Sequence, residues 1–156
     1  MPDFKNSVFA YIIQCRSKKY FSIFYWVSRA AMGIGFIGSG VRKLPGVKFT
    51  VLPVENPVGH FFEAMYQTGF YWNTIGAIQI LLGLMIFFDR SVVAATLVMM
   101  PVTINIFLAS VALQMTGTPI ITSAMLLANI FLLLWHFENY LSIIQKPKYL
   151  TDDIPD

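Results

Sequence analysis

Residues 29–44 read RAAMGIGFIGSGVRKL, an apolar and glycine-rich stretch with an arginine at its start and an Arg-Lys pair near its end. In a helix, five residues at offsets of 0, 4, 7, 11 and 14 from the first share one face. They are Arg29, Gly33, Phe36, Gly40 and Lys43. Charged groups and bare backbone are costly against lipid, so this face is predicted to point into a bundle of further helices.

The composition indicates an integral membrane protein. Of the 156 residues, 56% are hydrophobic and 12% are charged, whereas soluble domains carry about 25% charged residues. The length allows one domain. The net charge of +3 is small and dispersed along the chain, which does not indicate a nucleic-acid surface. The single cysteine, Cys15, excludes a disulfide within the chain.

Four membrane-spanning helices are predicted from the apolar segments. Residues 91–135 carry no formal charge and are too long for one crossing of about 20 residues, and the polar sequence QMTGTP at 114–119 divides them. The predicted spans are about 21–41, 71–88, 91–113 and 119–137. The fold class is therefore an all-α integral membrane protein, with an antiparallel four-helix transmembrane bundle over residues 21–140.

Three further segments flank or connect these spans. Residues 1–20 combine helical apolar spacing with a basic end, which predicts an amphipathic interfacial helix on the cytoplasmic membrane surface. In the long connection, Asn56 followed by Pro57 is typical of a helix N-terminus, and Gly69 stops the helix. This segment predicts a short outer cap helix over the mouth of the bundle. Residues 141–156 are predicted to form a cytoplasmic tail.

The distribution of Lys and Arg sets the predicted orientation. Four spans place both termini on one side, which then holds Lys5, Arg16, Lys18, Lys19, Arg90, Lys146 and Lys148. The opposite side holds Arg42, Lys43 and Lys48. Because cytoplasmic loops of membrane proteins are enriched in Lys and Arg, both termini are predicted to lie in the cytoplasm and the 42–71 connection outside. The predicted location is the bacterial cytoplasmic (inner) membrane.

The spacing Arg-x3-Gly-x2-Phe-x3-Gly-x2-Lys-Leu within residues 29–44 resembles the first-helix signature of the DoxX family of small four-span membrane proteins. Residues 57–62, PVGHFF, and the later Gly69-Phe70 are similar to the outer loop of that family. Residues 78–84, IQILLGL, are similar to its second-helix motif. The resemblance covers roughly residues 24–138, which is nearly all of the predicted membrane part.

The resemblance implies a role in quinone-linked redox chemistry. Some DoxX-family members are subunits of a thiosulfate:quinone oxidoreductase, others are linked to oxidative-stress complexes, and many have no assigned activity. The leading hypothesis is a DoxX-like membrane subunit that holds a quinone or a partner protein, while the redox chemistry takes place in another chain or cofactor. The alternative is a non-catalytic structural or assembly subunit of a larger membrane complex. Gln79 favours the alternative, because the family often carries a glutamate there and an amide cannot move a proton.

Polar residues on the predicted outer side and at mid-depth are candidates for a ligand pocket. Under the outer cap helix, an anion or a quinone head could bind to polar donors between apolar walls. The candidate ligand-binding residues are Lys43, His60, Glu63, Gln79 and Asn105, with Phe36, Tyr66 and Trp72 as walls. The same residues could instead cap helix ends and anchor the bundle at the membrane interface.

Arg29 is a cation inside the first predicted span. Such a residue forms either a buried ion pair or a ligand contact. The sequence offers Asp89 and Glu138 as acceptors for a structural ion pair. No catalytic residue is predicted, because the sequence shows no nucleophile with an adjacent base. No metal site is predicted either, because the two histidines, His60 and His136, fall on opposite sides of the membrane.

Overall fold

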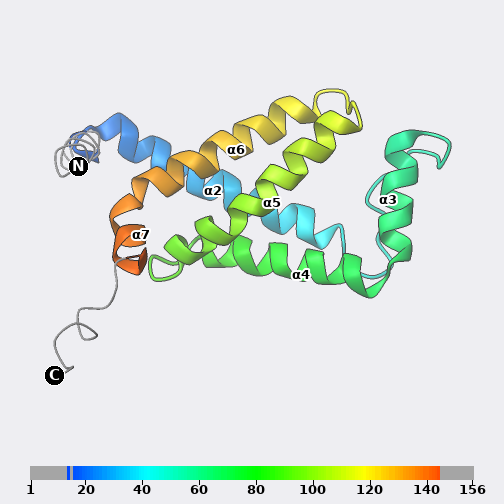
Figure 1. Cartoon of the computed structure of the whole chain (residues 1–156), viewed down its shortest axis with the longest axis horizontal. Coiled ribbons are helices and arrows are strands. Elements are labelled where there is room, and N and C mark those ends of the chain that lie inside the picture. The colour runs from blue at the N-terminus through cyan, green and yellow to red at the C-terminus, as the bar shows by residue number, and fades with distance from the viewer. Residues whose placement is uncertain (1–13, 15, 145–156) are drawn as a thin grey trace, which may run out of the picture.

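The computed structural model describes Gln14 and residues 16–144, and this part of the chain is all-helical (Figure 1). Its helices are α2 (Lys19–Val41), α3 (Pro57–Gln67), α4 (Phe70–Met85), α5 (Val92–Ala112), α6 (Thr118–Trp135) and α7 (Phe137–Ile144). Within the described residues, the three helices α2, α5 and α6 are long and apolar enough to cross a membrane. These helices identify a multi-pass membrane protein.

The second predicted span differs most from its prediction. Its helix, α4, is apolar but has 16 residues, and the chain turns at residues 86–90 before α5 begins. Such a helix is about 24 Å long, which is shorter than a hydrocarbon core of about 30 Å. The predicted span of 71–88 therefore joins a short helix to the turn that follows it.

The helices pack in two pairs. α2 packs mainly against α4, and α5 mainly against α6, with further contacts between α2 and α6 and between α4 and α5. The successive helices α2, α4, α5 and α6 run in alternating directions (Figure 1). α3 stands at the end of the molecule where α2 finishes, whereas α7 lies at the opposite end (Figure 1). The two ends of the assembly are therefore built differently.

The starts of α3 and α6 follow from local sequence chemistry. Asn56 Oδ1 accepts a hydrogen bond from the backbone N–H of Val58 at 2.9 Å, and Pro57 occupies the first turn of α3. α6 follows Gly117, whose φ of 75° lies in the left-handed region that favours glycine. The Asn56-Pro57 pair and the QMTGTP sequence thus mark helix boundaries as predicted.

The two ends of the chain extend beyond what the structure describes. The predicted interfacial helix at 1–20 lies largely outside the described residues, and so does the tail after residue 144. α7 was not predicted as a separate helix, and it extends helical structure into the segment predicted as tail. Tyr140 holds α7 against α5, because its hydroxyl oxygen lies 2.7 Å from Thr96 Oγ1 and donates to the Val93 carbonyl at 2.9 Å.

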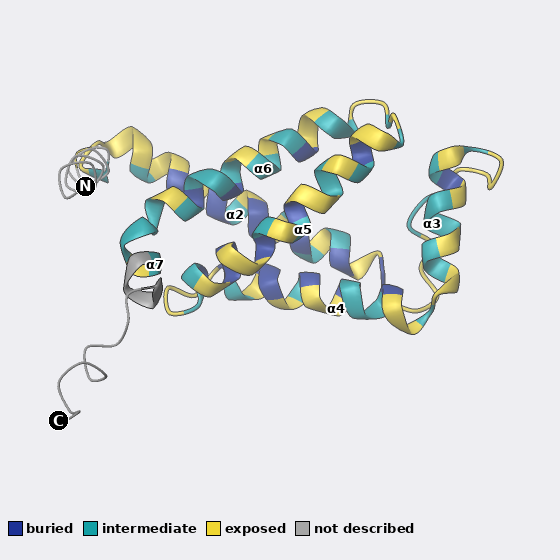
Figure 2. Ribbon diagram, in the orientation of Figure 1, coloured by how far each residue is buried: buried dark blue, intermediate teal, exposed yellow. Residues whose placement is uncertain are grey.

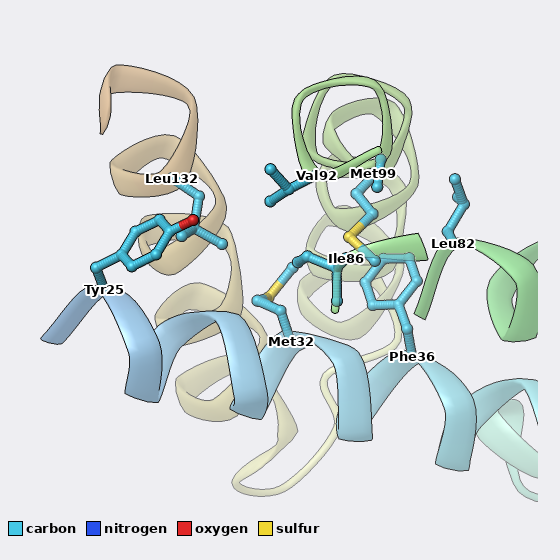
Figure 3. Close-up of a cluster of buried hydrophobic side chains, with 9 residues drawn as sticks. Tyr25, Met32, Phe36, Leu82, Ile86, Val92, Met99 and Leu132 are labelled. Atoms are coloured by element: carbon cyan, nitrogen blue, oxygen red, sulfur yellow. The ribbon is translucent and has the colours of Figure 1, made fainter. Parts of the chain in front are cut away.

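The hydrophobic core lies where α2, α4, α5 and α6 meet (Figure 3). Figure 3 shows Met32 and Phe36 of α2 close to Ile86, which follows α4, and to Met99 of α5. All four side chains are almost completely buried. The predicted inward face of α2 is confirmed in this respect, since Arg29, Gly33, Phe36 and Gly40 are buried on it.

The outer surfaces of the helices are apolar. Exposed residues run along the outward faces of α2, α4, α5 and α6 (Figure 2), and they include Ile34, Leu81, Leu108 and Leu127. Soluble monomers rarely expose such continuous apolar surface, whereas lipid solvates it well. The surface therefore supports the same membrane environment as the helix lengths.

Polar side chains connect the helices inside this apolar framework. Asn129 of α6 hydrogen-bonds Thr103 of α5 at 3.0 Å, and Ser110 of α5 lies 2.9 Å from Thr122 of α6 between their hydroxyl oxygens. Hydrogen bonds of this kind between membrane helices contribute roughly 1 kcal/mol each. They fix α5 against α6.

The backbones of α2 and α4 touch through glycines. A Cβ atom added to Gly40 would lie 2.6 Å from the carbonyl oxygen of Gly76, and one added to Gly83 would lie 2.9 Å from the carbonyl oxygen of Gly33. Such distances are shorter than real Cβ contacts, and backbone atoms cannot move aside as the end of a side chain can. The α2–α4 spacing therefore depends on the absence of side chains at these positions.

We expect Gly40→Ala to lower the free energy of unfolding by about 1–3 kcal/mol, the usual cost of overpacking. The matched control is Gly38→Ala on the same helix, because a Cβ there meets nothing within 4 Å. Unfolding of the detergent-purified protein by sodium dodecyl sulfate measures both variants. Equal stability of the two variants would contradict the backbone contact.

Candidate functional site

A cavity of about 1000 Å³ lies between α3, α4 and α5 and reaches the end of α2 and the start of α6. We call it the α3–α5 cavity. Its walls are mostly apolar and aromatic, with Phe61 and Phe62 from α3, Trp72 from α4 and Ile106 from α5. Its polar lining includes Ser39, Lys43, Gln79, Asn105 and Ser110. Apolar walls with a few polar groups are typical of small-molecule sites.

Lys43 occupies the end of this cavity where α2 finishes. Its side chain is buried, and Nζ donates hydrogen bonds to the Ser39 carbonyl oxygen at 3.0 Å and to Ser39 Oγ at 2.8 Å. The ammonium group also lies over two aromatic rings, 4.6 Å from the centroid of Phe49 and 5.0 Å from that of Trp72. Ser39 Oγ in turn donates to Gln79 Oε1 at 3.4 Å, which links α2 to α4.

Burial changes the acidity of Lys43. It lowers the pKa of the ammonium group from 10.5 to about 8, because the charged form loses its hydration. Within the described residues, no carboxylate lies within 4.0 Å of Nζ, since the ion pairs present there use other cations. The lysine is therefore a buried cation held by neutral partners.

Four of the predicted ligand residues meet in the α3–α5 cavity, namely Lys43, Gln79, Trp72 and Asn105. Phe36 does not line the cavity, because it is fully buried in the hydrophobic core. His60 does not line it either, because it lies on the exposed side of α3.

Glu63 and Tyr66 line a different and smaller pocket of about 190 Å³ between α3 and the segment before it. Glu63 accepts a hydrogen bond from Lys48 Nζ at 3.1 Å, and this bond lowers the pKa of its carboxyl group. The predicted set of candidate residues is thus divided between the α3–α5 cavity, the small pocket, the core and the exposed side of α3.

Two residues of the Lys43 environment were missed in the sequence. Ser39 lies one helical turn before Lys43, and that four-residue spacing would have been a usable signal. Phe49 lies in an irregular segment, where no periodicity indicates the direction of a side chain.

Arg29 lies in a polar cluster at the middle of α2, where the turn between α4 and α5 packs against it. It is buried, and its guanidinium donates to Asp89 Oδ1 at 2.6 Å, to the Ile86 carbonyl oxygen at 2.5 Å and to the Tyr25 hydroxyl at 3.1 Å. Of the two acceptors that the sequence offers, Asp89 is thus the one beside Arg29. Glu138 lies 3.4 Å from Arg16 instead.

His136 belongs to the same cluster. Its Nε2 lies 3.1 Å from the Tyr25 hydroxyl. Burial lowers the pKa of this imidazole, and the nearby charges of Arg16 and Arg29 lower it further. The cluster therefore connects α2, the α4–α5 turn and the α6–α7 junction through hydrogen bonds.

No protein-family model, curated protein or solved structure matches this chain. The fold and the cavity define its class as a multi-pass helical membrane protein with an apolar-walled cavity that ends at a buried lysine.

We expect Asp89→Asn to lower the free energy of unfolding by about 1–3 kcal/mol, although the Asp89 side chain is 84% exposed. The reason is that Arg29 stays buried and loses its counter-charge. The neighbouring Arg90→Gln is the control, since an exposed substitution usually changes stability by less than about 0.5 kcal/mol. Equal effects in chemical unfolding would show that the pair does not hold the fold.

We expect the stability of the wild type relative to Lys43→Met to rise between pH 8 and pH 10.5. In this window the unfolded state binds more protons than the folded state, because the folded pKa of about 8 lies below the ordinary 10.5. The gain is at most about 3 kcal/mol. Unfolding of both proteins across this pH range measures it. A constant or falling difference would contradict the lowered pKa of the buried Lys43.

Proposed function

We propose that this chain is a DoxX-like four-span membrane subunit that holds a quinone in the α3–α5 cavity for a quinone-linked redox system. In this proposal α4 is the fourth crossing, completed at one end by the apolar residues Ile86, Phe87 and Phe88. α3 is the cap at the outer mouth of the bundle. The electron transfer takes place in a partner chain or a cofactor that it binds.

The observation that carries the proposal is the combination of donors and aromatic walls in one cavity. A quinone presents a flat ring, two carbonyl acceptors and an apolar tail. Lys43 Nζ could donate a hydrogen bond to a carbonyl oxygen of the quinone, and the ring of Trp72 offers an aromatic surface beside it. The distance from Nζ to the centroid of this ring is 5.0 Å. Phe61 and Phe62 of α3 supply apolar surface for the ring or the tail.

The predicted orientation completes the proposal. The excess of Lys and Arg near the two ends of the chain supports an orientation with both termini in the cytoplasm of a bacterium and α3 on the outer face of the inner membrane. The cavity then lies in the outer half of the bilayer. A quinone would enter it from the lipid phase, and a partner subunit would meet it from outside.

Quinone content and binding test this function. We expect organic extraction of the protein, purified in a mild detergent, to release a quinone that absorbance identifies. We also expect added decylubiquinone to bind about tenfold or more weakly to Lys43→Ala, since one hydrogen bond to a charged group contributes about 1.5–3 kcal/mol. Lys48→Ala is the control, because Lys48 pairs with Glu63 outside the cavity.

The quinone role should be abandoned if the extract holds no quinone and Lys43→Ala binds decylubiquinone as the wild type does. That result would favour the structural or assembly subunit, for which the cavity is a lipid-filled gap.

A further inference from the structure

The ammonium group of Lys43 has no anionic partner within the described residues, and this bears on the charge of the ligand that the cavity would bind. Its side chain is 6% exposed. An ammonium group has three N–H donors, and two of them bond to the neutral oxygens of Ser39. A buried cation is stable only when an opposite charge or several dipoles compensate for its lost hydration. The remaining donor has no anionic partner among the described side chains.

Arg29 is the other buried cation of this helical face, and it has a carboxylate partner. Its guanidinium is as deeply buried as Lys43, but it reaches the carboxylate of Asp89 at 2.6 Å. Arg29 lies in the middle of α2 and Lys43 just beyond its end. Among the described residues, Arg29 has a carboxylate partner, whereas Lys43, which lines the cavity, has none. Lys43 has instead the two oxygens of Ser39 and the rings of Phe49 and Trp72, so an anion that pairs with it would come from outside the described residues.

A second donor without an acceptor lies next to Lys43. Trp72 is 3% exposed and lines the α3–α5 cavity. Its indole Nε1–H has no hydrogen-bond partner within the described residues. A buried donor that lacks an acceptor costs about 1–3 kcal/mol. Two buried donor groups, the Lys43 ammonium and the Trp72 indole, therefore lie side by side at this end of the cavity.

The rest of the cavity is suited to an apolar chain. Its volume of about 1000 Å³ lies at the upper end of the range of about 300–1000 Å³ that is usual for small-molecule sites. Its apolar lining includes Leu52, Met65, Ile75, Val102 and Ile106. A ligand with a polar head and an apolar chain could place its chain against these residues.

We infer that the Lys43 end of the α3–α5 cavity is an oxyanion site, which binds an amphiphile whose head group carries a negatively charged carboxylate or phosphate oxygen. Lys43 Nζ donates a charge-assisted hydrogen bond to that oxygen, and the chain of the ligand lies against the apolar residues of α3, α4 and α5. The inference rests on the proposed function in one respect, that the cavity is a ligand site. It does not depend on the ligand being a quinone.

Three ligands with one chain and different heads test the inference. Radiolabelled oleate, oleyl phosphate and oleyl alcohol are bound at pH 7 to the full chain in a non-ionic detergent. We expect oleate, oleyl phosphate or both to bind at least tenfold more tightly than oleyl alcohol, and the two anions to distinguish a carboxylate head from a phosphate head. Lys43→Met should remove this preference, whereas Lys48→Met should keep it.

Two outcomes would overturn the oxyanion site: both anions bind no more tightly than oleyl alcohol, or Lys43→Met retains the preference. If Lys43→Met does not fold, the pH dependence of the wild type decides instead. The preference for oleyl phosphate, which is anionic throughout, should fall at least severalfold between pH 7 and pH 9.5 as Lys43 loses its proton. A preference that stays constant over this range would also overturn the inference.

The outcome for decylubiquinone is independent of this test. An anion preference that depends on Lys43, without decylubiquinone binding, keeps the oxyanion site and removes the quinone proposal. Decylubiquinone binding without an anion preference does the reverse.

Discussion

The contact between the backbones of α2 and α4 is the constraint on which the remaining geometry depends. Because Gly40 approaches Gly76 and Gly33 approaches Gly83 without intervening side chains, the two helices lie close along most of their length. This closeness brings Ser39 within 3.4 Å of Gln79. It also places Lys43 beside the ring of Trp72. With a larger spacing, Ser39 would lose Gln79 on α4, and Arg29 would lose Ile86 and Asp89, which follow α4.

The two cations of α2 are stabilised by different means, although they share one helical face. Arg29 combines a carboxylate, a backbone carbonyl and a hydroxyl, which suits the several fixed donors of a guanidinium. Lys43 has two oxygens of one serine and two aromatic rings. The third N–H of this ammonium group has no oxygen acceptor among the described residues. One cation is therefore in an ion pair, and the other lines the cavity without a carboxylate partner among the described residues.

Much of the helical organisation could be predicted from the sequence, but the candidate site could be predicted only in part. The Asn56-Pro57 cap and the QMTGTP break act over a few residues, so local chemistry was sufficient to locate α3 and the α5–α6 connection. Lys43, Gln79, Trp72 and Asn105 do line one cavity. His60 does not, because the rotation of α3 turns its phenylalanines toward the cavity and the histidine outward, and the sequence of a short helix does not fix that rotation.

The sequence by itself determined the membrane class, the inward face of α2 and the presence of two cations on that face, because composition and helical period are properties of the chain alone. Only the tertiary structure decided which cation has a counter-charge. Asp89 and Glu138 are both far from Arg29 in sequence, and the packing of α4 against α2 selects Asp89. The same packing leaves Lys43 with neutral partners. Partner choice depends on distances between helices, and helical periodicity contains no such distances.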